Sequence, residues 1–135
     1  MTITEVSRIY GIPADTLRYY ERIGLLPPVN RGASGNRDFT EEDCNWVYYI
    51  KVMRGAGVTI ESLLDYVKMF QMGASTIEAR KQILIEQYEQ IEERINILKA
   101  AQDRLKMKID GYEERILKYE EEKLKKQKNL KGDVK

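Results

Sequence analysis

The C-terminal half of the chain carries a heptad repeat of apolar residues, and this repeat limits the folds open to the whole molecule. Counted from Ile77, two seams alternate four and three residues apart between about residues 76 and 124. Eleven of the fourteen seam positions are apolar or aromatic. This period is typical of a coiled coil. The pattern therefore predicts one helix, roughly 70 Å long at 1.5 Å per residue.

A helix of this length needs a partner, because about 75 preceding residues cannot cover its whole apolar stripe. The simplest partner is a second copy of the chain, so we predict a homodimer. The predicted dimerisation residues are nine of the eleven apolar or aromatic seam members: Leu84, Tyr88, Ile91, Ile95, Leu98, Leu105, Ile109, Tyr112 and Ile116. Gly111 lies outside the seams and should weaken the helix by about 1 kcal/mol.

The first part of the chain predicts a pair of short helices joined by a tight turn. Thr2 and Glu5 have the spacing of a capping box, which favours a helix start there. Gly11 interrupts after two turns, and Pro13 suits the first turn of a second helix that ends at Gly24. This arrangement is a helix-turn-helix pattern.

A small basic hairpin is predicted after the helix pair. Residues 31–39 are rich in turn formers and carry two arginines, as the wing of a winged helix would. Thr40 caps a third helix that ends at Gly55, and a fourth helix ends near Gly73. We predict a mainly α fold with three parts: a winged helix-turn-helix head (1–73), a coiled-coil dimerisation helix (74–124) and a flexible basic tail (125–135).

Composition excludes several function classes. The 135 residues include no histidine and one cysteine, so zinc hydrolases, histidine-based acid–base sites and disulfide frameworks are excluded. We predict no enzyme, no metal and no cofactor. With no apolar run of membrane-spanning length and no expected secretory signal, we predict a cytoplasmic protein without membrane contact.

The net charge is +1, but residues 6–37 hold five arginines against two acids, a local basic stripe.

Three motifs together resemble those of the MerR-family transcriptional regulators. They are T-L-R-Y-Y-E-R-I-G-L-L at 16–26, G-N-R-D-F at 35–39 and Glu42-Asp43. The resemblance implies a winged head with two wings and a homodimer through an antiparallel coiled coil. It also implies binding to an inverted repeat in double-stranded promoter DNA. The dimer would bend and untwist the promoter spacer so that RNA polymerase engages both of its contact elements, which is indirect readout.

The resemblance also assigns DNA-binding roles to individual residues. Arg18 and Tyr19 would face the groove, and Tyr20 would reach the backbone unless it is a core residue. The remaining assigned positions lie at the start of the second helix, in the wing and near the second wing: Asp15, Thr16, Arg31, Asn36, Arg37, Lys51 and Arg54. Arg37 has a structural alternative, which is to brace the wing against Asp38 or Glu42.

The effector is less constrained by the sequence. One cysteine and no histidine argue against metal or iron–sulfur sensing, and we expect no appended drug-binding domain. Residues 50–57 and 76–80 resemble the small subgroup that responds to aldehydes and other electrophiles, but Val52 stands where that subgroup has its reactive cysteine. Cys44 is then either a buried core residue or a sensor thiol.

Three further alternatives stay open. Tyr66, Phe70 and Met72 could line a ligand pocket or simply pack the joint between the fourth helix and the coiled coil. The chain could be a simple repressor that does not distort its promoter. It could also be a coiled-coil adaptor without DNA binding, although arginines interleaved with tyrosines on a short helix argue against that.

Overall fold

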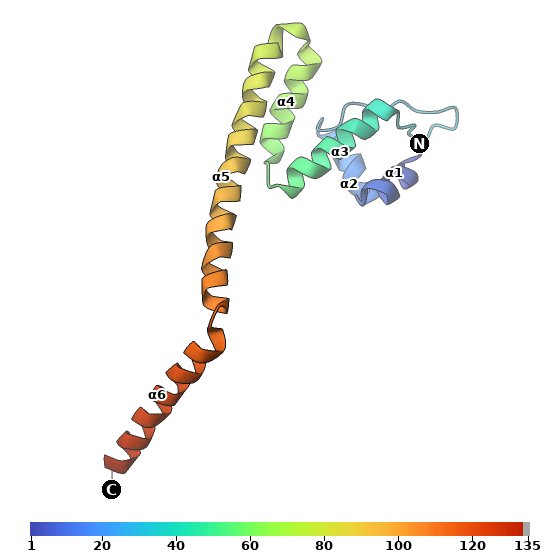
Figure 1. Ribbon diagram of the computed structural model, residues 1–135. Coiled ribbons are helices and arrows are strands. Elements are labelled where there is room, and N and C mark those ends of the chain that lie inside the picture. Colours follow the sequence, from blue (N-terminus) through green and yellow to red (C-terminus); the bar gives the residue numbers. More distant parts are fainter. Residues whose placement is uncertain (134–135) are drawn as a thin grey trace. The chain divides into compact units, whose positions relative to one another are not determined.

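The computed structural model describes the backbone of residues 1–133 and the side chains of residues 1–129, and all regular structure there is helical (Figure 1). The helices in chain order are α1 (Ile3–Tyr10), α2 (Ala14–Arg22), α3 (Glu41–Gly55), α4 (Ile60–Met72), a 3₁₀ turn η1 (Ala74–Thr76), α5 (Ile77–Ile109) and α6 (Tyr112–Asp133). The chain divides into two compact units, residues 1–91 and the residues from 92 onward. No helix in the described part is long and apolar enough to cross a membrane.

Two predicted helix starts of the head are confirmed by their caps, at Thr2 and Thr40, whereas Pro13 precedes α2 without a side-chain cap bond. The Thr2 hydroxyl accepts a hydrogen bond from the Glu5 amide at 3.2 Å, and Thr40 forms a full capping box with Asp43 at the start of α3. Gly11 ends α1 in the left-handed conformation, with φ of 66°, which glycine adopts without steric cost.

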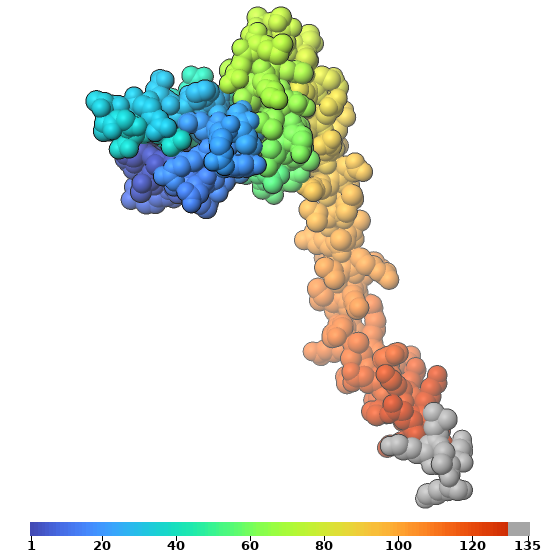
Figure 2. Space-filling model, turned by 180° about the vertical axis from the view of Figure 1, so that it is seen from behind, coloured from blue at the N-terminus to red at the C-terminus, as the bar shows by residue number. Residues whose placement is uncertain are grey.

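One apolar core holds the first unit together, and in Figure 2 its blue, cyan and green residues lie together in a single body. The core residues that are almost fully buried come from every helix of the head and from the segment after α2: Val6, Leu17, Leu25, Leu26, Val47, Ile50 and Leu63. Ile91 on α5 packs partly against this core. Ile91, a predicted seam residue of the long helix, therefore also packs against the head.

The wing is a turn-tipped hairpin, as predicted, with one antiparallel β-bridge, between Arg31 and Arg37. Its tip is a turn in which the Gly35 amide donates to the Gly32 carbonyl at 2.9 Å, and Gly35 has φ of 82°. The Gly32 amide donates to the Asn36 carbonyl at 2.7 Å.

The long helix is broken at Gly111, where the sequence predicts continuity. Gly111 takes φ of 70°, α5 ends at Ile109, and Arg115 donates to the Asp110 carbonyl at 2.9 Å, which satisfies a group freed by the break. A glycine without Cβ makes this left-handed turn inexpensive. Residues 125–133, expected to form a flexible tail, are helical within α6, and residues 134–135 lie outside the described part.

Candidate nucleic-acid interface

The exposed face of α2 carries a charged pair at its N-terminal end. Leu17 is buried and fixes the opposite face of the helix in the core. Arg18 donates to the Asp15 carboxylate at 2.7 Å, while the Arg18 side chain stays 46% exposed. An exposed pair of this kind contributes little stability, and its guanidinium is free to exchange this partner for another acceptor.

The tyrosines of α2 differ in environment. Tyr19 is 41% exposed, and the Arg22 guanidinium lies 5.4 Å from its ring centroid. Tyr20 packs partly buried against the head core, and its carbonyl accepts hydrogen bonds from the Leu25 and Leu26 amides. The surroundings of Tyr20 favour the core role.

Arg37 ties the wing to α2. Its Nε lies 3.3 Å from both carboxylate oxygens of Glu21, and these two side chains are only 17% and 18% exposed. Glu21 also accepts from the Val29 amide at 3.2 Å. The brace anticipated from the sequence therefore exists, but its partner is Glu21 and not Asp38 or Glu42. Sequence reasoning missed Glu21, because the two residues are 16 positions apart and only the turn of the wing brings them together.

A recess of about 300 Å³ lies where the start of α1, the exposed face of α2 and the wing meet. Three arginines line it, namely Arg18, Arg31 and Arg37, together with Asn36 and the first residues of the chain around Thr2. Arg31 also donates to the Gly35 carbonyl at 3.2 Å. Asp15 and Glu21 do not line the recess but pair with Arg18 and Arg37. The recess therefore suits an anion such as a backbone phosphate through Arg31, and through Arg18 when it exchanges its exposed partner.

The structure thus brings four of the predicted DNA-binding residues to one recess and places the others elsewhere. Asp15, Thr16, Tyr19 and Tyr20 are on α2 but do not line it. Lys51 is exposed on α3. Arg54 donates to the Val58 carbonyl at 2.9 Å, so it closes the turn between α3 and α4.

Cys44 is buried, with 7% of its surface exposed, and belongs to the head core. It lies beside Tyr10, where burial and then the Cys44 thiol raise the pKa of the tyrosine above its ordinary value. This environment favours the core interpretation over the sensor thiol.

Four aromatic rings pack together on α3 and α4, at the place where a ligand pocket was considered. Trp46 packs edge to face on Phe70 with 5.1 Å between the ring centroids, and the ring centroids of Tyr49 and Tyr66 lie 5.8 Å apart. They border a shallow recess of about 230 Å³ that does not include Met72. The rings pack α3 against α4, and at the joint with α5 the Arg80 guanidinium lies over the Phe70 ring, so packing is favoured over a ligand pocket.

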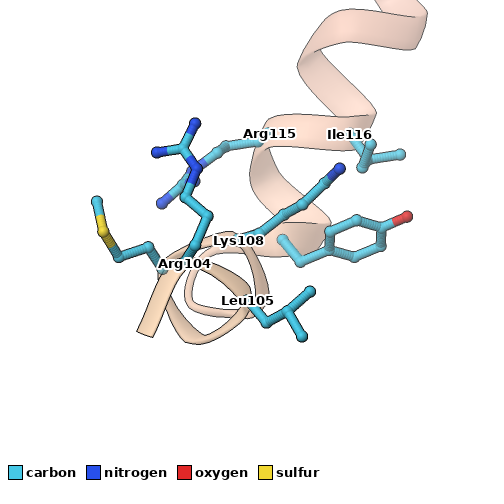
Figure 3. Close-up of a pocket in the computed structure, with 7 residues that line it drawn as sticks. Arg104, Leu105, Lys108, Arg115 and Ile116 are labelled. Carbon is cyan, nitrogen blue, oxygen red and sulfur yellow. The ribbon is translucent and has the colours of Figure 1, made fainter. Parts of the chain in front are cut away.

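The helix break forms a larger recess within the second unit, of about 490 Å³ (Figure 3). Three cations reach it from the two helices: Arg104, Lys108 and Arg115. Its apolar lining comes from Leu105, Tyr112, Ile116 and Met107, and the first three are predicted seam positions. The recess is therefore part of the surface on which a partner helix is expected.

The seam itself is exposed on the single chain. The exposed fractions are 71% for Tyr88, 65% for Leu98 and 60% for Leu105. Apolar residues exposed in a regular line along a helix mark an interaction surface.

Comparisons with known proteins agree with this site. Residues 1–69 match the family described as MerR HTH family regulatory protein. The transcriptional regulator AdhR of Bacillus subtilis is 50% identical over 91 residues, which are 67% of this chain and 65% of that protein.

Two solved structures are also similar. A putative MerR-family regulator from Listeria monocytogenes has a TM-score of 0.81 and 44% identity over 90% of this chain and 92% of its own. HiNmlR, a MerR-family regulator lacking the sensor domain and bound to promoter DNA, has a TM-score of 0.77 and 31% identity over 84% and 90%. These matches include the head, so they do not favour the adaptor alternative. The chain belongs to the MerR family of helix-turn-helix transcriptional regulators.

Proposed function

We propose that this protein binds an inverted repeat in promoter DNA as a homodimer and controls transcription by distorting the promoter spacer. The observation that carries the proposal is the recess at the junction of α2 and the wing, where three arginines converge without a lining carboxylate. HiNmlR, which is similar over most of this chain, was solved on promoter DNA.

In this function α2 enters the major groove and the wing follows the phosphate backbone. Arg18 is the residue that reads a base edge or a phosphate, because its long forked donor lies on the exposed face of α2. Arg31 and Asn36 contact the backbone from the wing, and Arg37 holds the wing in place. The supporting contacts are assigned to Asp15, Thr16, Tyr19 and Lys51, whereas Tyr20 packs against the core and Arg54 closes the turn between α3 and α4.

The second copy of the chain covers the exposed seam of α5 and α6. A dimer with two identical heads matches an inverted repeat by symmetry. Untwisting the spacer between the half-sites then lets RNA polymerase engage both promoter elements. We infer a non-enzymatic role in the cytoplasm, where the DNA lies.

Selection from a random double-stranded DNA library, carried out with and without a thiol-reactive aldehyde, tests the proposal. We expect an enriched inverted repeat. With roughly two phosphate-contacting arginines per head, Arg18 and Arg31, and so about four per dimer, the logarithm of affinity should fall against the logarithm of salt concentration with a slope of about −4. No enriched motif would refute DNA binding by this chain. Transcription in vitro from promoters of different spacer length separates the distorting regulator from a simple repressor, since only the former activates a long spacer.

A further inference from the structure

Gln87 stands apart from the rest of α5. It is 3% exposed, and of the α5 residues, all of which the structure describes, only Gln87 is buried. Its side chain joins three helices: the Tyr49 hydroxyl of α3 donates to Oε1 at 3.0 Å, and Nε2 donates to the Ser62 hydroxyl of α4 at 2.9 Å. A buried amide with both ends satisfied fixes its surroundings strongly, because losing either bond leaves a polar group unpaired.

The other contacts that the described residues show between α5 and the head are one long hydrogen bond, from Arg80 to the Gly73 carbonyl at 3.4 Å, and contacts that are less directional. Ile91 makes apolar contact with the core, and Arg80 lies over the Phe70 ring at 5.0 Å from its centroid. Apolar packing has no preferred direction, whereas hydrogen bonds weaken steeply when their angles change. Buried polar groups are best attested as devices that select one register between helices. Tyr49 remains a donor at ordinary pH, because burial raises its pKa above the usual value.

We propose that Gln87 is a specificity-determining residue: by holding α5 at one angle and rotation on α3 and α4, it selects the spacing between the two half-sites that the dimer binds. This inference rests on the proposed function, namely a homodimer on an inverted repeat.

The length of α5 makes the effect measurable. Leu98 lies eleven residues beyond Gln87, about 16 Å along the helix. A change of tilt at Gln87 is magnified along this length, because α5 is one helix from Ile77 to Ile109. If the angle between the head and α5 is poorly fixed, the dimer therefore binds half-sites whose separation differs by one base pair from the preferred one.

The test measures affinity of the full chain for duplexes with identical half-sites whose separation varies by single base pairs. Gln87→Leu keeps the size of the side chain and removes both hydrogen bonds. Gln90→Leu, the same substitution at an exposed position on the same helix, is the matched control.

We expect wild type and the Gln90 variant to prefer one spacing by about tenfold over its neighbours, equivalent to about 1.4 kcal/mol. Gln87→Leu should reduce this preference to about threefold or less, with the base preference inside each half-site unchanged, which a general loss of stability would not produce. A folded, dimeric Gln87→Leu protein with the wild-type spacing profile overturns the proposal. If that variant does not fold, Tyr49→Phe and Ser62→Ala each remove one bond, and unchanged profiles in both overturn it equally. Wild type that binds no inverted repeat would instead refute the proposed function.

Discussion

Replacing Glu21 by glutamine tests the connection between the wing and α2. The carboxylate accepts from the Val29 amide at 3.2 Å and lies 3.3 Å from Nε of Arg37 through each oxygen. Glutamine retains one carbonyl oxygen for Val29 but presents an amide donor to the guanidinium. Arg37 then lacks an anionic partner in a site where its side chain is 17% exposed.

The expected loss in the free energy of unfolding lies between two limits. Breaking a fully buried pair costs about 3–5 kcal/mol, whereas an exposed pair contributes about 0–1 kcal/mol. The two side chains are mostly buried, but the contacts are long, so we expect Glu21→Gln to lower the free energy of unfolding by about 2 kcal/mol. With a urea dependence of about 1–3 kcal/mol per molar, the unfolding midpoint should fall by roughly 1 M.

Urea unfolding followed by circular dichroism at one protein concentration measures this change. Glu89→Gln, at an exposed position of α5, serves as the control and should change the free energy by less than about 0.5 kcal/mol. Arg37→Met and the double variant complete a cycle, which isolates the coupling between the two residues. A coupling near zero, with Glu21→Gln as stable as its control, would refute the brace.

The same variants separate bracing from contact with DNA. If Arg37 only positions the wing, Glu21→Gln and Arg37→Met should weaken operator binding to a similar extent. If its guanidinium also contacts a phosphate, Arg37→Met should cost more and reduce the salt slope by about one.

Three further outcomes are expected. Arg18→Ala should weaken specific operator binding by about 1–3 kcal/mol, measured by fluorescence anisotropy. Arg22→Ala, which removes a cation stacked on the Tyr19 ring, should have a smaller effect. Equal affinity of wild type and the Arg18 variant would remove Arg18 from the interface. Leu98→Lys should give a monomer in analytical ultracentrifugation, whereas Ile97→Lys should stay dimeric. The two side chains are similarly exposed on the single chain, at 65% and 61%, but only Leu98 lies in the seam. If both variants are dimeric, the seam assignment is wrong. The Cys44 thiol, 7% exposed, should react with a thiol reagent at least about tenfold more slowly in the folded protein than in urea, and rapid labelling of the folded protein would restore the sensor hypothesis.

Local patterns in the sequence determined the family and most of the helices. Capping residues such as Thr2 and Thr40 act within one turn, so their effect is visible in neighbouring letters. The heptad seam is likewise a local repeat, and it predicted the long helical region without any tertiary information. The motif at 16–26 was sufficient for the resemblance, which the comparisons confirm.

The tertiary structure decided which polar groups meet across the chain. Glu21 and Arg37 pair over 16 positions, and Gln87 meets Tyr49 over 38; neither spacing follows a helical or strand period. The break at Gly111 was also decided by structure, because a glycine tolerates both a helix and a left-handed turn. Local periodicity reports which face of an element is apolar, whereas the partner of a buried polar group depends on how whole elements pack, and that packing arises from the summed contacts of the entire core.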